Sequence, residues 1–207
     1  WSNYNIYLST AMIPVVIMVF VFLLVPYSIG TELKFHRSRQ WIKMAGGNIH
    51  IAIAGKLIPQ TLIFLLIMWG FEFYIFYHLQ FPHPGGLGPI LLLGFLSVIA
   101  CQGFGIFAFS LVPSLRMSMS VCSLWSVVSF SACGATFPIF AMSPMIQSLA
   151  QMFPLRHYYM IYQLCIFNGY PLSYAWINIT VLLLFLALPF LNINHIKTAM
   201  LKYVYTP

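Results

Sequence analysis

A basic segment, TELKFHRSRQWIKMAGGNIHIAIAGK at residues 31–56, joins the first two long apolar runs of this chain. It contains five of the nine Lys and Arg residues of the chain. The apolar runs on either side of it are nearly free of charge. Because Lys and Arg gather in the cytoplasmic connections of membrane proteins, this segment predicts both the class of the protein and its orientation.

The composition excludes a water-soluble fold. Hydrophobic residues make up 61% of the chain and charged residues 5%, whereas soluble domains carry about 25% charged residues. The formal net charge is +7, but the cations lie at the ends of apolar runs and form no exposed basic stripe. We therefore expect a lipid bilayer as the partner of these charges, and no nucleic acid.

The runs are long enough to cross a membrane as helices. About 20 mainly apolar residues are needed for one crossing, and barrel strands would be shorter and would alternate with polar residues. The sequence predicts an all-α fold, a polytopic transmembrane bundle. Its five predicted spans are residues 6–29, 57–77, 89–112, 117–140 and 174–193.

The connections between these spans differ in charge. Residues 77–88 hold no Lys or Arg, whereas Arg116 follows the third span and Lys197 and Lys202 follow the last. Only Arg156 lies on the opposite side. We expect a multi-pass protein of the cell (inner) membrane, with the N-terminus of this chain extracytoplasmic and its C-terminus cytoplasmic.

The first seven residues contain no positive charge and the chain begins at Trp1. The first run is therefore not expected to be a secretory signal. We expect residues 1–207 to form a single transmembrane domain, and to be a fragment of a longer protein with at least one span upstream.

Within the segment 31–56, basic residues alternate with apolar ones up to Met44, and Gly46-Gly47 follows. This pattern predicts a short amphipathic helix on the cytoplasmic surface, a glycine break, and the start of the next helix. An ordinary basic anchor beside the membrane is the alternative.

Residues 141–173 are too apolar for a solvated loop and are interrupted by proline. Proline breaks the helical hydrogen-bond pattern, so we expect two short helices that enter the outer leaflet and turn back. A sixth full crossing is the alternative, but it would place the C-terminal lysines outside.

Glu72 is the only acidic residue inside a predicted span. A charge at the bilayer centre costs about 2.5–3.5 kcal/mol on insertion scales. Two interpretations remain open: Glu72 reaches headgroup water, or it makes a polar contact in the bundle or along a substrate path.

Serines recur every three residues in the fourth predicted span, at Ser120, Ser123, Ser126 and Ser129. Small residues on one stripe allow close helix packing, and their hydroxyls can also line a polar conduit. Both interpretations stay open.

The motifs of nucleotide, metal and redox chemistry are missing from the sequence. In a phosphate-binding loop ending at Gly55-Lys56, His50 would stand in place of a glycine and Leu57 in place of Ser or Thr. The four cysteines and six histidines show no metal-ligand spacing. We expect no cofactor and no metal in this chain, and cysteines that serve as packing residues.

The order of several short motifs resembles the membrane permease subunit of type 2 ATP-binding cassette (ABC) exporters, close to the multidrug-efflux permeases. The N-terminal part contributes Pro14, Glu32, Trp41, Ala45-Gly46 and GKLIP at residues 55–59. The C-terminal part contributes Pro138, MSP at residues 142–144, FPLRHY at residues 153–158 and Asn168-Gly169. Family members usually have six spans, and this chain shows five.

The resemblance implies a permease domain that dimerises, as a homo- or heterodimer, on ABC ATP-binding subunits. ATP and Mg would be bound by that partner. The coupling element would comprise Glu32, Lys34, Phe35, Arg37, Arg39, Trp41, Lys43 and Gly46. The first and fourth spans would line the path, with Ser123, Ser126, Ser129 and Glu72 as path or packing residues. The outer gate would comprise Pro138, Pro144, Pro154, Arg156 and His157.

The function implied is export of a hydrophobic or amphiphilic substrate by ATP-driven alternating access. One alternative is a membrane-embedded lipid-processing enzyme whose site would include Arg156, His157 and Glu72. Another alternative is a membrane scaffold without transport.

Overall fold

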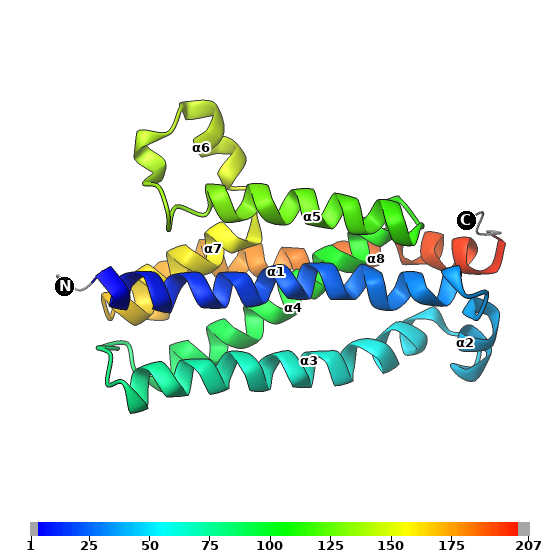
Figure 1. Cartoon of the computed structure of the whole chain (residues 1–207), viewed down its shortest axis with the longest axis horizontal. Helices are drawn as coiled ribbons and strands as arrows, with labels where there is room; N and C mark the ends of the chain where they lie inside the picture. The colour runs from blue at the N-terminus through cyan, green and yellow to red at the C-terminus, as the bar shows by residue number, and fades with distance from the viewer. Residues whose placement is uncertain (1–3, 203–207) are drawn as a thin grey trace.

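The computed structural model describes the backbone of residues 4–202 and the side chains of residues 9–202. Every regular element in the described part is a helix, which confirms the all-α prediction. The long helices are α1 (Tyr4–Lys34), α3 (Ile49–Phe73), α4 (Leu87–Leu111), α5 (Leu115–Ala132) and α8 (Trp176–Lys202). They run along the long axis of one elongated bundle (Figure 1).

Short elements join the long helices. They are α2 (Ser38–Met44), α6 (Pro144–Ala150) and α7 (Pro154–Ile161), with single 3₁₀ turns at Ile139–Ala141 and Leu172–Ala175. Wider π-helical turns continue α3 over Tyr74–His78 and α7 over Tyr162–Phe167. Figure 1 shows α2 at the same end of the bundle as the C-terminal part of α8, with α6 and α7 towards the other end.

Within the described residues, four helices are long and apolar enough to cross a membrane. They are Ser9–Lys34, Ile49–His78, Leu87–Leu111 and Leu172–Lys202. The fourth predicted span, residues 117–140, differs: α5 ends at Ala132 and does not meet the same requirement. Its end is set by Gly134, whose φ of +94° lies in the left-handed region, and by Pro138.

The core of the bundle is built around α4, which packs against α8 on one side and α1 on the other. A Cβ atom on Gly103 would lie 2.9 Å from the Cα of Leu186 in α8, and one on Gly105 would lie 2.9 Å from the Cβ of Val25 in α1. Glycine at these positions lets the three helices approach closely. In α8, Pro189 has no N–H to donate to the carbonyl of Phe185, and that carbonyl lies against Gly103.

The segment after the first span is more divided than the sequence suggests. Helix α1 continues to Lys34, so Glu32 and Lys34 belong to α1 and not to a surface helix. His36 at φ +58° reverses the chain, and the surface helix α2 has only seven residues. The predicted glycine break is confirmed, because Gly46 and Gly47 have φ of +65° and +78° before α3 begins.

The serine repeat of α5 does not stay on one face. Ser126 and Ser129 are buried, whereas Ser120 and Ser123 are exposed. A step of three residues falls short of the 3.6-residue turn, so the row drifts around the helix. The buried positions Ser118, Cys122, Ser126, Ser129 and Ala132 instead follow the helical period.

Candidate functional site

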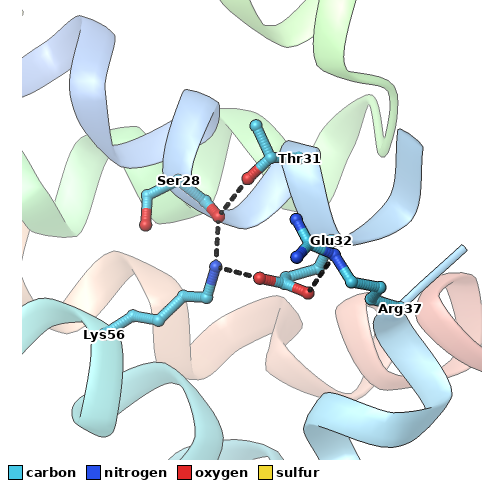
Figure 2. A network of polar contacts seen from close by, with 5 residues as sticks. All are labelled: Ser28, Thr31, Glu32, Arg37 and Lys56. Atoms are coloured by element: carbon cyan, nitrogen blue, oxygen red, sulfur yellow. Dashed lines mark hydrogen bonds and ion pairs between the residues drawn. The ribbon is translucent and has the colours of Figure 1, made fainter. Parts of the chain in front are cut away.

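The strongest polar cluster lies where α1, α2 and α3 meet (Figure 2). The Lys56 ammonium is 2.7 Å from the Glu32 carboxylate and donates a hydrogen bond of 2.6 Å to the carbonyl of Ser28. It also lies 5.3 Å from the ring centroid of Trp41 in α2. One cation from α3 therefore contacts both the end of α1 and the middle of α2.

Local sequence explains this geometry. Ser28 is in the last two turns of α1, near the C-terminal end, where the helix dipole favours a cation. Thr31 donates its hydroxyl to the same Ser28 carbonyl. The side chains of Lys56 and Glu32 are only 20% and 16% exposed, which limits screening of the pair by water. Arg37 is more distant from Glu32, at 3.9 Å, and its side chain is 60% exposed.

Helix α2 is also tied to the end of α8. The Ser38 hydroxyl donates to the Met200 carbonyl at 2.7 Å, and Arg39 donates to the Leu201 carbonyl at 3.3 Å. These carbonyls belong to the last turn of α8, which needs donors from outside the helix. Three long helices thus hold α2 in place.

The predicted coupling residues divide between two faces. Trp41 is buried beneath Lys56, and Glu32 is turned towards α3. Phe35 and Met44 are 57% and 75% exposed. We call the exposed residues Lys34, Phe35, Arg37, Lys43 and Met44 the basic-aromatic patch. The cations of Lys34 and Arg37 lie 5.7 and 5.4 Å from the Phe35 ring. Gly46 belongs to the turn that follows.

Glu72 lies inside the bundle. Its residue is 4% exposed, and its Oε2 has no hydrogen-bond partner within the described residues. That oxygen would be 3.4 Å from a Cβ atom placed on Gly94, beside Trp69, which donates to the Leu91 carbonyl. The headgroup-water interpretation does not fit this burial.

A buried phenol lies in the electrostatic range of Glu72. Tyr158 in α7 is completely buried, and its phenol interacts electrostatically with Glu72. The Tyr158 hydroxyl is buried and, among the described residues, has no hydrogen-bond partner. The Glu72 carboxyl and the Tyr158 hydroxyl, each with a buried oxygen that lacks a hydrogen-bond partner among the described residues, therefore lie in the same part of the bundle.

The inner face of α5 is filled by packing. The Trp125 ring stacks on Phe104 of α4 at 4.8 Å and meets Phe153 edge-on at 4.7 Å. Ser126 donates its hydroxyl to its own helix, at the Cys122 carbonyl. In this arrangement the serines allow close contact more than they line an open conduit.

The predicted gate residues lie in or beside two short helices. Pro144 and Pro154 begin α6 and α7, at the helical position that proline suits. Pro138 precedes a 3₁₀ turn. Figure 1 shows α6 projecting away from the bundle, whereas α7 is almost entirely buried.

Arg156 and His157 are held by different neighbours. Arg156 donates to the Cys133 carbonyl at 3.0 Å and fastens the end of α5 to α7. The His157 ring lies 2.9 Å from Asn178 Oδ1 and 2.8 Å from the Gln151 carbonyl. These contacts do not assemble Arg156, His157 and Glu72 into the site that the enzyme alternative requires.

All four cysteines are free and buried. In the part of the chain that the structure describes, no group of three His, Cys, Asp or Glu residues is placed to hold a metal ion.

A comparison with protein families identifies the relationship. The model of the ABC-2 family transporter proteins matches residues 2–192. This chain belongs to that family. No individual curated protein matches the chain. The ABC-2 protein is a multi-pass membrane protein and a permease component of an ABC system, whose ATPase is on a separate subunit.

Two contacts around α2 were not predicted. The sequence placed Lys56 in the basic segment and in the GKLIP motif, but did not pair it with Glu32. The sequence does contain a signal for an ion pair, because Glu32 is the only acidic residue in the basic segment and several cations lie near it in the chain. The contact between Ser38 and Met200 had no signal, because it joins residues 162 positions apart.

Proposed function

We propose that this ABC-2 permease exports a hydrophobic or amphiphilic substrate, driven by ATP hydrolysis in a separate ABC subunit that docks on α2. The observation that carries the proposal is the division of the segment 34–44, which includes α2, into two faces. The inner face is fastened to α1, α3 and α8, and the outer face exposes the basic-aromatic patch.

This division suits the transfer of force. A docked subunit that moves Phe35 and Met44 would move the ends of α1, α3 and α8 together, because the ties of Lys56 and Ser38 leave α2 little independent motion. An aromatic and methionine surface surrounded by cations is suited to a groove in another protein. ATP and Mg are bound, in this proposal, by that partner.

Transport requires no covalent step in the permease. The ATP-binding subunit shifts the population between inward-open and outward-open arrangements, provided that it binds the two with different affinity. The permease works as a homo- or heterodimer around a central path. Glu72 and the Tyr158 hydroxyl offer buried polar groups near that path.

The proposed orientation follows from charge. The end with α2 carries most cations and faces the cytoplasm of the cell (inner) membrane. The N-terminus of the chain and the helices α6 and α7 then lie on the extracytoplasmic side. In this proposal α5 is the fourth of five spans, and on the extracytoplasmic side α6 and α7 form a re-entrant outer gate fastened by Arg156 and His157.

Reconstitution of the permease in vesicles with and without its ABC ATP-binding subunit tests the proposal. We expect co-purification of the two proteins and substrate flux that requires both the subunit and ATP. Lipid turnover by the permease alone would favour the enzyme alternative. Stable binding of the subunit without nucleotide-dependent flux would favour the scaffold.

A further inference from the structure

A groove opens between α3, α4 and α8, on a different side of α4 from the contact with α1. It has a volume of about 330 Å³, within the range of small-molecule sites of roughly 300–1,000 Å³. Its walls are formed by Leu57 of α3, Ile106 of α4, and Pro189 and Phe190 of α8. The residues that line it include none from α1 or α5, so it is separate from the central path proposed above.

One buried polar group interrupts the apolar lining. Gln102 lines the groove and is 5% exposed. Its Oε1 lies 2.8 Å from the Thr61 hydroxyl, which is also 2.7 Å from the Leu57 carbonyl and has one proton to donate. Its Nε2 is buried and has no partner in residues 9–202. An amide donor left unpaired in apolar surroundings is unfavourable, so a ligand that accepts its hydrogen bond gains affinity.

The depth of Gln102 limits what this ligand can be. Gln102 lies nine residues before the end of α4 at Leu111, which is about 14 Å at 1.5 Å per residue. The hydrocarbon core is about 30 Å thick, so this position is near its middle. The ester groups of a bilayer phospholipid stay at the interface and do not reach it.

The charge of the groove limits the ligand further. His50 at the rim, stacked on Phe190, is the only titratable residue among those that line the groove. No carboxylate or ammonium is present to bind an ion. We propose that the groove binds a neutral, hydrophobic small molecule through a carbonyl or ether oxygen that accepts a hydrogen bond from Gln102 Nε2. Binding of this ligand does not depend on the proposed export function. Only the further step, that the ligand is a transported substrate, rests on that function.

Photolabelling with benzophenone, a neutral ketone, tests the proposal on the permease in lipid nanodiscs without its ATP-binding subunit. We expect labelling of the segments 50–57 and 186–193, located by mass spectrometry. Fluorenone should compete at a concentration about fivefold lower than fluorene, which has the same shape without the carbonyl. In Gln102→Leu the labelling should remain and the advantage of fluorenone should disappear.

A second pair of variants keeps the test valid if Gln102→Leu does not fold. Ala54→Phe should fill the groove from its exposed rim and abolish labelling, whereas Leu62→Phe on the exposed face of the same helix should not. Equal competition by fluorene and fluorenone in the unaltered protein would identify plain hydrocarbon, such as a lipid acyl chain, as the occupant and would overturn the proposal. Labelling that Ala54→Phe leaves unchanged would overturn it as well. Neither result depends on ATP-driven transport, so the two proposals can fail separately.

Discussion

Glu32 at the end of α1 and Lys56 in the second turn of α3 form an ion pair at 2.7 Å that the structure shields from water on most sides. The same ammonium contacts the Ser28 carbonyl and the Trp41 ring. The pair therefore joins the three helices that meet at the basic end of the bundle.

Replacement of Glu32 by Gln should destabilise the protein. The change leaves the Lys56 ammonium without its charged partner, and a hydrogen bond to a charged group contributes about 1.5–3 kcal/mol. Thermal unfolding in detergent measures this loss. Arg37→Gln is the matched control, because Arg37 is exposed and 3.9 Å from the carboxylate, and it should cost under about 1 kcal/mol. Equal losses in both variants would contradict the assignment.

Replacement of Glu72 should change the free energy of unfolding in the opposite direction to replacement of Glu32. Its Oε2 is buried and lacks a partner among the described residues, so Glu72→Leu removes an unfavourable group. The free energy of unfolding should stay the same or rise by on the order of 1 kcal/mol, while Glu32→Leu lowers it. If Glu72 lies on the substrate path, flux in Glu72→Leu should fall although the protein is stable. A marked loss of stability would show that Glu72 has a structural partner.

Gly103 should not accept a side chain. A Cβ atom there would meet the backbone of Phe185 and Leu186, so Gly103→Ala must push α4 and α8 apart. Overpacking of this kind costs about 1–3 kcal/mol. Gly70→Ala, in the interior of α3 with no atom within 4 Å of the new Cβ, should be neutral or stabilising. The relevant measurement is the thermal midpoint of both variants, and similar midpoints would argue against close packing at Gly103.

The orientation can be tested by labelling in intact cells. All native cysteines are buried, which keeps the background low. A cysteine at Lys43 should react with a membrane-impermeant maleimide only after the cells are opened, whereas one at Leu79 near the other end of α3 should react in intact cells. Reaction of both cysteines from outside would contradict the proposed topology.

The sequence predicted features that depend on local chemistry. Long apolar runs specify helices in a membrane, and the glycine pair at positions 46 and 47 and the prolines at positions 144 and 154 mark where helices end or begin. These signals require no knowledge of neighbours. The family resemblance from ordered motifs was also correct over nearly the whole chain.

The remaining features depend on tertiary contacts. Trp41 was expected on a partner-facing surface, but the cation of Lys56 covers it from a helix that begins after the turn. The serine repeat suggested one stripe because its period of three was read without the drift of a 3.6-residue helix. The groove beside Gln102 has no sequence signal, since three separate helices form it.

Stimulation of ATP hydrolysis in the assembled complex tests the central claim most directly. Phe35→Ala combined with Met44→Ala removes the exposed apolar part of the basic-aromatic patch without disturbing the buried ties of α2. The few contacts that dominate an interface each cost about 2 kcal/mol or more when truncated. We predict that the double variant folds normally and binds the ATP-binding subunit at least about tenfold more weakly, with loss of stimulated hydrolysis. Ile58→Ala, at a residue that is 59% exposed but lies outside the patch, should behave as the unaltered permease does. Full stimulation by the double variant would contradict the claim that α2 receives the force of ATP hydrolysis.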